Sequence, residues 1–214
     1  EYLGRDPNVG YWRDMHLKIR GPAVLQLQQV FVEDWYYATG ANLTQAEIFP
    51  RPAEDGPVKA QVVASGPARD REEMHWLMFA ALNEARETIH LTTSYFVPPA
   101  ALVSALEAAA YRGVRVRLMV AGKMTYRWTV LAGRSYYASL LDAGVEIYEY
   151  ERGLLHSKTL TIDGHWSLVG TANVDARSLF LNFEVAVAIY DRRTAEQLER
   201  EFEKDVADAR RILA

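Results

Sequence analysis

The stretch around which this chain is organised reads His156-Ser-Lys158-Thr-Leu-Thr-Ile-Asp163-Gly-His-Trp-Ser-Leu-Val-Gly170-Thr171-Ala-Asn173. His156 and Lys158 lie two positions apart, so on a β-strand their side chains point to the same face of the sheet. Threonine and apolar residues alternate directly after them, as in a half-buried strand. The stretch therefore predicts a strand that presents an imidazole and an ammonium group side by side.

This set of side chains suits displacement at phosphorus. A neutral imidazole nitrogen of His156 can attack phosphorus and form a covalent phosphohistidine, which divides one difficult step into two. Lys158 can stabilise the charge that builds on the phosphate oxygens, and Asn173 and Thr171 can donate to the same oxygens. We expect Glu184, at the start of a later strand, to hold the second ring nitrogen of His156. This route needs neither a metal nor a cofactor.

Other residues are weaker candidates for the site. Asp163 belongs to the same motif as His156, but with Gly164 after it the carboxylate could instead fix a turn and pair with a cation. Tyr95 and Phe96 follow a strand that should end where α/β folds form their crevices, so they could contact a lipid chain or belong to the core. Arg127 lies in a loop of cations and aromatics that suits a phosphate head group, or a solvated loop.

Composition sets outer limits on the function. The 214 residues are 50% hydrophobic and carry a net charge of -4, so the chain can bury a sizeable core and has no general attraction for nucleic acid. Cysteine is absent, which excludes disulfides and thiolate chemistry. No apolar run approaches the roughly 20 residues of a membrane-spanning helix. Because the chain starts at Glu1 without a methionine, we expect a fragment of a longer protein.

Strands and helices are expected to alternate through most of the chain. Such alternation is typical of parallel strands joined by crossover helices, whereas the region after residue 150 supplies strands without long helices between them. The sequence therefore predicts an α/β fold with a mixed, largely parallel sheet. The expected strands are 15–20, 59–64, 88–93, 114–120, 145–150, 156–163, 167–169 and 184–190, and the expected helices are 22–38, 70–85, 99–112, 133–143 and 192–210.

An internal repeat divides the chain. Trp12 to Asp34 resembles Asn182 to Asp205, since both contain an acidic residue, an alternating strand, a turn, a helix and Phe-x-x-Asp. Between them, residues 39–57 lose all periodicity and contain several Gly and Pro residues. We therefore expect residues 1–38 to be the tail end of one repeat, 39–57 a linker, and 58–214 a complete second repeat.

The central stretch resembles the phospholipase D superfamily. The motif of that family, His-x-Lys-x4-Asp-x6-Gly-Ser/Thr-x-Asn, is matched in full between His156 and Asn173. Further segments, such as Thr93-Ser-Tyr-Phe-Val-Pro and Asn182-Phe-Glu184, are similar to the bacterial cardiolipin synthase branch. The resemblance implies a phospholipase D-like layered α-β-α domain with a nucleophilic His, and a reaction that transfers a phosphatidyl group between phosphatidylglycerol molecules without a metal.

The resemblance also implies that half of the site is missing, because family enzymes combine two such motifs. Asp14 aligns with Glu184 and would then orient the His of a first motif that this chain lacks. We expect the carboxy-terminal half of a cardiolipin synthase-like phosphatidyltransferase, inactive alone. Its partners would be phosphatidylglycerol or cardiolipin and the amino-terminal half with the first motif.

Two alternatives remain at this point. One is a single-motif phosphodiesterase or nuclease that completes its site by pairing two copies of the chain. The other is a degenerate lipid-binding domain. The acidic net charge disfavours nucleic acid as a partner. If the chain is instead half of a phosphatidyltransferase, we expect it at the bacterial cell membrane, as the peripheral catalytic part of a membrane-anchored parent protein.

Overall fold

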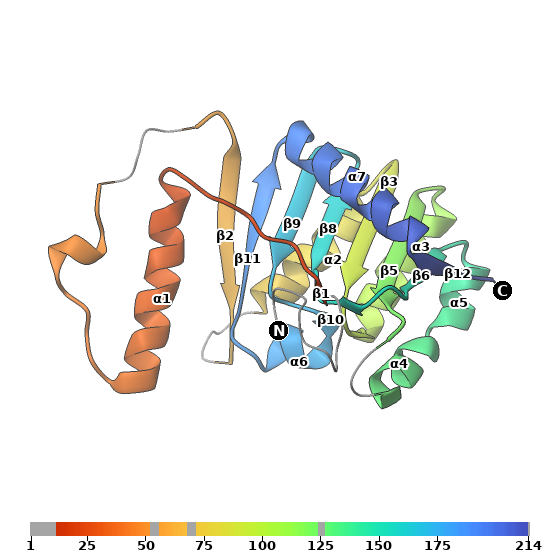
Figure 1. The fold of residues 1–214 in the computed structure, drawn as a ribbon, viewed down its shortest axis with the longest axis horizontal. Helices are drawn as coiled ribbons and strands as arrows, with labels where there is room; N and C mark the ends of the chain where they lie inside the picture. The colour runs from red at the N-terminus through yellow and green to blue at the C-terminus, as the bar shows by residue number, and fades with distance from the viewer. Residues whose placement is uncertain (1–11, 52–55, 68–71, 124–126, 214) are drawn as a thin grey trace.

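The computed structural model describes residues 12–51, 56–67, 72–123 and 127–213. Its centre is a sheet of eight strands (Figure 1). Their order across the sheet is β12 (Ala209–Ile212), β6 (Glu146–Tyr150), β5 (Arg115–Ala121), β3 (Thr88–Thr93), β8 (Thr159–Ile162), β9 (Trp166–Gly170), β11 (Glu184–Tyr190) and β2 (Lys59–Ser65).

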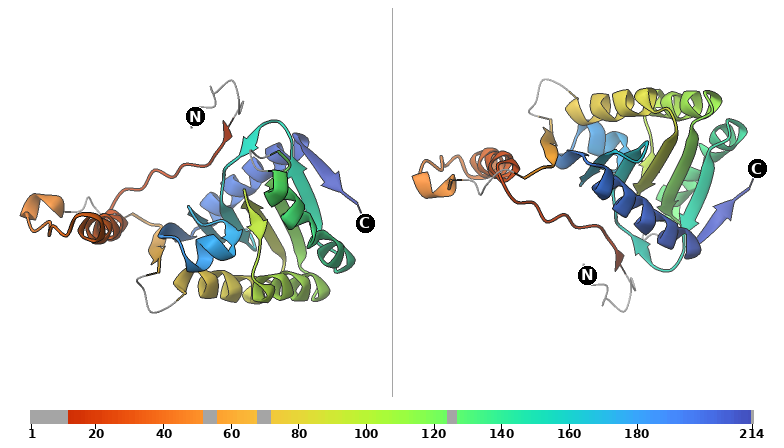
Figure 2. Two further views of the ribbon diagram at one scale, coloured as in Figure 1. Left: turned by 90° about the horizontal axis from the view of Figure 1, so that it is seen from below. Right: turned by 90° about the horizontal axis from the view of Figure 1, so that it is seen from above.

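Helices cover both faces of this sheet, which confirms the layered α/β fold (Figure 2). One face carries α2 (Glu73–Glu84), α3 (Ala100–Tyr111) and α5 (Tyr137–Asp142). The other carries α7 (Arg192–Ala207), whose residues Ala195, Leu198 and Phe202 are buried. Because both faces are covered, β3 and β5 are buried along nearly their whole length.

The sheet is mixed, as expected, but it contains fewer parallel pairs than expected. In the described sheet, β3 pairs with β5 and β5 with β6 in parallel, and the other five pairings are antiparallel. The reason is the connections. After β6 the strands β8, β9 and β11 follow one another without a crossover helix long enough to reverse the chain.

The strand ends that carry the candidate site residues lie along one edge of the sheet, the lower edge in Figure 1, which we call the site edge. The parallel strands β3, β5 and β6 end there, and the antiparallel strands β8 and β11 begin there. Two short strands pair at this edge: β4 (Phe96–Val97) with β10 (Val174–Asp175). The helices α4 (Arg127–Arg134) and α6 (Ala176–Phe180) lie along the same edge.

The first described segment departs from expectation. The strand predicted over 15–20 does not form, and residues 14–20 belong to no helix or strand. Instead β1 (Trp12–Arg13) pairs in parallel with β7 (Leu154–Leu155). The helix α1 (Ala23–Thr39) ends at Gly40, whose φ of 70° places it in the left-handed region, and none of the residues of α1 is buried. A short helix, η1 (Ala46–Ile48), lies in the predicted linker.

Several elements were not predicted, and two of them change the expected helices. The expected helix over 192–210 stops at Ala207, and β12 then adds a strand to the sheet by pairing with β6. The expected helix over 133–143 is shortened to α5, and a separate helix that was not predicted, α4, ends just before it at Arg134. No helix in the described part of the chain is long and apolar enough to cross a membrane.

Candidate active site

His156 is held at the site edge by residues from the start of the described chain. The pairing of β1 with β7 continues with a hydrogen bond of 2.8 Å from the backbone N–H of His156 to the carbonyl oxygen of Arg13. The next residue, Asp14, therefore lies beside the imidazole ring. Its Oδ2 is 2.9 Å from Nδ1 of His156, and the Trp12 ring lies 5.1 Å from the imidazole, centre to centre.

The Asp14 carboxylate is the partner that fixes the orientation of His156. Burial raises the pKa of Asp14. The hydrogen bond from His156, the backbone N–H of Met15 and the nearby positive charges lower it by more, so the pKa of Asp14 is below its usual value. An ionised Asp14 accepts the proton on Nδ1 and leaves the lone pair on Nε2. The His156 side chain is 36% exposed, so the ring is open to an incoming group.

Arg13 anchors this arrangement to α7. Its Nε donates to Asp205 at 2.7 Å, and its second terminal nitrogen lies 3.4 Å from Glu201, both on α7. A short two-residue strand would be unstable alone. The ion pairs with α7 hold β1 in place, and they thereby hold Asp14 against His156.

Lys158 is buried next to His156 with only 9% of its surface exposed. Its Nζ donates to the Ser94 hydroxyl at 3.0 Å and to the carbonyl oxygen of His156. Burial lowers the pKa of Lys158 to about 8, against the opposing effect of the carboxylates of Asp14, Glu184 and Asp175. The group is therefore mostly an ammonium ion at neutral pH, and it loses its proton above about pH 8, well below the usual range for lysine.

Asn173 is oriented by the neighbouring strand end. Its Oδ1 accepts a hydrogen bond of 3.4 Å from the backbone N–H of Tyr95, and Val174 donates to the Thr93 hydroxyl at 3.1 Å. With its oxygen used in this way, the amide NH2 is the end of the side chain that can donate to a ligand. This geometry agrees with a phosphate-binding role at the site edge.

Glu184 does not contact His156, which corrects the expected pairing. Thr171 donates its hydroxyl proton to Glu184, and Nδ2 of Asn182 donates to the same carboxylate at 3.1 Å. The reason is the strand order: β9 lies between β8 and β11, so the starts of β8 and β11 are two strand spacings apart, roughly 9–10 Å. The partner of His156 is Asp14, which we had assigned to a different histidine.

Asp163 lies at the opposite edge of the sheet and takes no part in this cluster. It follows Lys158 by five residues of extended chain, roughly 17 Å. Its carboxylate accepts hydrogen bonds from the backbone N–H groups of Arg86, Glu87 and Thr88, at 2.8 to 3.3 Å. With φ of 51°, Asp163 also forms the turn between β8 and β9. Its role is structural, as the turn alternative had it, and its place in the catalytic set was wrong.

The possible lipid contacts have different outcomes. Phe96 is 3% exposed and packs against Tyr136, so it belongs to the core and not to a lipid surface. Tyr95 is half-buried beside Asn173. Arg127 is the first residue of α4, and its side chain lies outside the described residues. Ser94 and Trp12 were missed, although Ser94 directly follows β3, where a site residue is expected.

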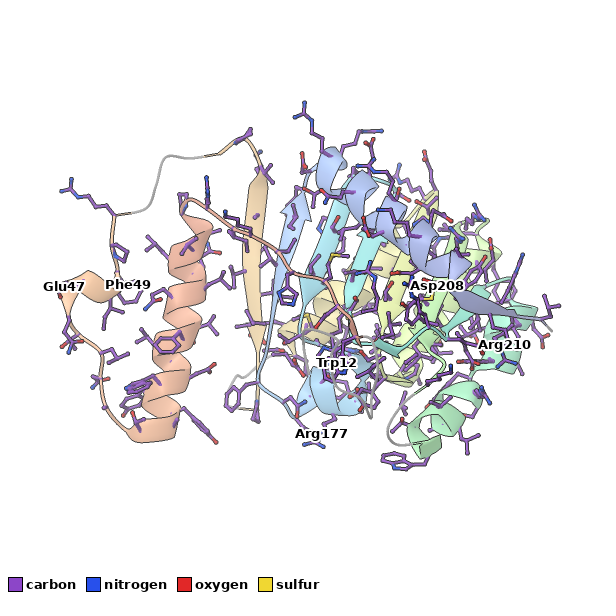
Figure 3. The ribbon with its side chains drawn as sticks, viewed as in Figure 1. Trp12, Glu47, Phe49, Arg177, Asp208 and Arg210 are labelled. Carbon is purple, nitrogen blue, oxygen red and sulfur yellow. The ribbon has the colours of Figure 1, made fainter. Side chains whose placement is uncertain are left out.

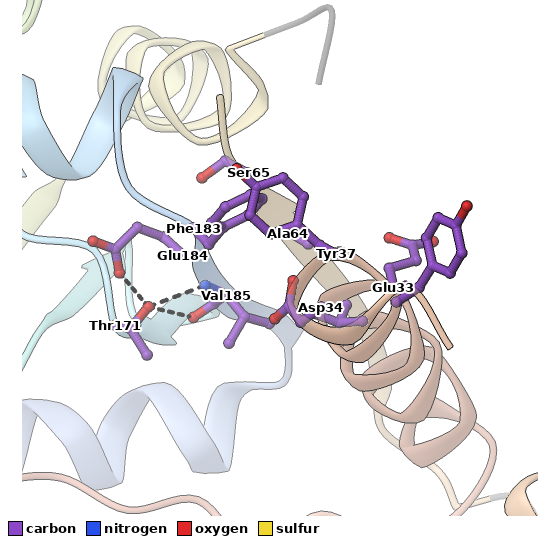
Figure 4. Close-up of a pocket in the computed structure, with 12 residues that line it drawn as sticks. Glu33, Asp34, Tyr37, Ala64, Ser65, Thr171, Phe183, Glu184 and Val185 are labelled. Carbon is purple, nitrogen blue, oxygen red and sulfur yellow. Dashed lines mark hydrogen bonds between the residues drawn. The ribbon is translucent and has the colours of Figure 1, made fainter. Parts of the chain in front are cut away.

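A groove opens beside Thr171 and Glu184 (Figure 4). It has a volume of about 740 Å³ and lies between α1 and the ends of β2 and β11. Its walls carry the aromatic rings of Tyr37 and Phe183, whose centres are 4.9 Å apart, and the carboxylate of Asp34. Within the described residues, no three His, Asp or Glu side chains are placed to hold a metal ion.

Solved structures show that this architecture is the phospholipase D-like fold. Nuc from Salmonella typhimurium, a phospholipase D family member, superposes with a TM-score of 0.64 at 21% identity, over 73% of this chain and 99% of that chain. Phosphatidylserine synthase from Haemophilus influenzae superposes with a TM-score of 0.56 at 16% identity, over 72% of this chain and 40% of that chain.

The sequence comparison makes the assignment more specific. The family profile described as "Cardiolipin synthase, PLD-like domain" matches residues 78–206, and the chain belongs to this family. Cardiolipin synthase 2 of Bacillus anthracis is 43% identical over 99% of this chain, and cardiolipin synthase of Geobacillus thermodenitrificans is 43% identical over 98%. The chain spans 42% of the length of each of these relatives. The resemblance drawn from the motif is thus confirmed.

Proposed function

We propose that this chain is the carboxy-terminal half of a cardiolipin synthase-like phosphatidyltransferase. One observation carries the proposal: Asp14, His156, Lys158 and Asn173 converge at one edge of the sheet in a member of the cardiolipin synthase family. An oriented imidazole beside a buried ammonium group suits attack on a phosphodiester. Phosphatidylglycerol is the substrate that the family assignment supports.

The proposed reaction has two displacements. Nε2 of His156 attacks phosphorus, a P–N bond forms, and the bond from phosphorus to the glycerol oxygen breaks. A second histidine gives its proton to the departing glycerol oxygen. A hydroxyl of a second phosphatidylglycerol then attacks the phosphohistidine, gives its proton to that histidine, and displaces His156, which yields cardiolipin. Lys158 and Asn173 stabilise the phosphate oxygens in both steps.

The second histidine is proposed to come from an amino-terminal half. Residues 1–38 would be the end of that half, 39–57 a linker, and 58–214 the domain that carries His156. The exposed residues Val24, Phe31 and Trp35 of α1 support this division, because the corresponding face of α7 is buried on its own sheet. Residues 14–20 likewise belong to no sheet of the described chain, as expected if the strands that would pair with them lie in the amino-terminal half.

The same repeat assigns a role to Glu184. Asp14 reaches across from the end of the first repeat to His156, so Glu184, at the equivalent position of the second repeat, would reach the histidine of the first. The carboxylates are thus exchanged between the halves, the reverse of the pairing predicted from the sequence. A location at the periphery of the bacterial cell membrane, without nucleic acid as a partner, is part of the same proposal.

The test is covalent capture in the full-length parent. With phosphatidylglycerol labelled in the phosphate, the parent should form an acid-labile phosphohistidine that His156→Ala abolishes, with cardiolipin formed from the same lipid. Capture that persists on another residue would reject His156 as the nucleophile. If the 214-residue chain alone turns over phosphodiesters with a rate that rises as the square of its concentration, the paired-chain phosphodiesterase is correct instead.

A further inference from the structure

An apolar rim flanks the candidate site. It consists of four large side chains at the site edge with 42% to 67% of their surface exposed: Trp128, Leu131, Leu181 and Phe183. The first two belong to α4, and the last two follow α6, one on each side of Asn182. Seen from below in the left panel of Figure 2, α4 and α6 both lie on the near side of the sheet.

The orientation of α4 is fixed by its inner face. Thr129 is buried, and a Cβ on Gly133 would lie 2.9 Å from the carbonyl oxygen of Phe96, so this side of the helix is packed closely against β4. Trp128 and Leu131 are three residues apart and therefore share the other face. A helix held in this way presents its two largest apolar residues outward at a fixed position beside the site.

The other end of the rim is joined to the site by hydrogen bonds. Leu181 and Phe183 flank Asn182, whose Nδ2 donates to Glu184. Arg177 on α6, labelled at the lower edge of Figure 3, is exposed and donates to Asn182 at 3.3 Å. Lys123, two residues after the end of β5, is a second exposed cation at this edge. Apolar side chains and cations thus lie along the same edge of the sheet as the candidate site.

We propose that this rim is the surface by which the domain contacts an anionic lipid bilayer. The inference rests on the proposed function, since a site that acts on phosphatidylglycerol must reach a head group at the bilayer surface. The net charge of -4 offers no general attraction to anionic lipid, so local contacts must supply the binding. Trp and Leu side chains partition into the interface, and Arg177 and Lys123 complement the charge of the head groups.

The experiment compares vesicle binding by the full-length parent and its variants. Trp128→Ser combined with Leu131→Ser should weaken co-sedimentation with phosphatidylglycerol vesicles by about tenfold or more, because two large side chains lose their apolar contacts. The matched control is Tyr111→Ser. Tyr111 is 72% exposed at the end of α3, on the opposite edge of the sheet, and its loss should leave vesicle binding unchanged.

A second measurement separates this inference from the proposed function. With a short-chain phosphatidylglycerol below its micelle concentration, the double variant should turn over at the rate of the parent, whereas on vesicles its rate should fall with its binding. If neither the parent nor the double variant turns over any lipid but their vesicle binding still differs, the proposed reaction is wrong and the assignment of the rim as the bilayer contact is retained. Equal vesicle binding by parent and double variant would overturn the rim. A lowered melting temperature with unchanged vesicle binding would overturn it too, because it would show that protein covers these residues.

Discussion

Replacement of Asp14 by Asn should change which ring nitrogen of the neutral His156 imidazole carries the proton. Asp14 accepts the Nδ1 proton at 2.9 Å and is kept ionised by contacts that outweigh the effect of its burial. A hydrogen bond to a charged group contributes about 1.5–3 kcal/mol, so its loss would shift the balance between the two neutral tautomers by roughly 10- to 150-fold. The variant keeps the size of the side chain and removes only its charge.

Nitrogen NMR of the histidine rings measures this tautomer balance directly in the 214-residue chain. At a pH where the imidazole is neutral, His156 of the wild-type chain should show a protonated Nδ1 and an unprotonated Nε2. In Asp14→Asn the two forms should mix. His156→Gln identifies the signals, since the chain has four other histidines.

Glu184→Gln is the matched control for this experiment. Glu184 is bound to Thr171 and Asn182, so its loss should leave the His156 signals in place. If Asp14→Asn changes nothing, or if Glu184→Gln mixes the tautomers instead, the assignment of Asp14 as the orienting residue is refuted. In the full-length parent, Asp14→Asn should slow phosphohistidine formation by a similar factor of roughly 10 to 150.

Three further predictions concern Lys158, Ser94 and Asp163. Because burial lowers the pKa of Lys158 to about 8 from 10.5, the parent should lose activity above about pH 8. The unfolded chain binds the proton more tightly, so the stability of the isolated chain relative to Lys158→Met should rise between those pH values, by about 3 kcal/mol in urea titrations; a flat difference would contradict the shift. Ser94→Ala removes an acceptor of Nζ and should move the alkaline limb of the parent's pH profile to lower pH, whereas Ser157→Ala, whose hydroxyl donates to Arg13, should not. Asp163→Ala should cost the chain about 2–3 kcal/mol of stability by urea unfolding and leave the His156 NMR signals unchanged; altered signals would tie Asp163 to the site.

The regular elements could be predicted because their periodicity is strong. The strands 88–93 and 184–190 have the bounds that the sequence predicts, since alternation and flanking turns define both ends. The strand predicted over 15–20 also alternates, yet no strand of the described chain pairs with it. Alternation indicates a half-buried strand but does not supply a partner. β12 was missed because Arg210 and Arg211 give it no apolar pattern, and its stability comes from pairing with β6.

The candidate site could be predicted in its residues but not in its contacts. His156, Lys158 and Asn173 lie together because one motif and the strand ends of one sheet place them there. The pairing of His156 with Asp14 joins residues 142 positions apart through the contact of β1 with β7. Neither two-residue strand has a pattern long enough to be recognised in a sequence. An acidic residue at a strand start, such as Glu184, is the more visible candidate, and the strand order rules it out.

The charges around Lys158 argue that the described site is electrostatically incomplete. Three carboxylates, Asp14, Glu184 and Asp175, act on this one ammonium group. A phosphodiester anion placed beside Lys158 would meet more negative than positive charge from these groups, and like charges at close range cost free energy. We therefore propose that further cations join before the phosphate binds well, and that the proposed amino-terminal half, with its own His and Lys, supplies them. We expect isothermal titration to find that a soluble phosphodiester binds the full-length parent at least about tenfold more tightly than this chain; equal affinities would show that the charges of this half suffice.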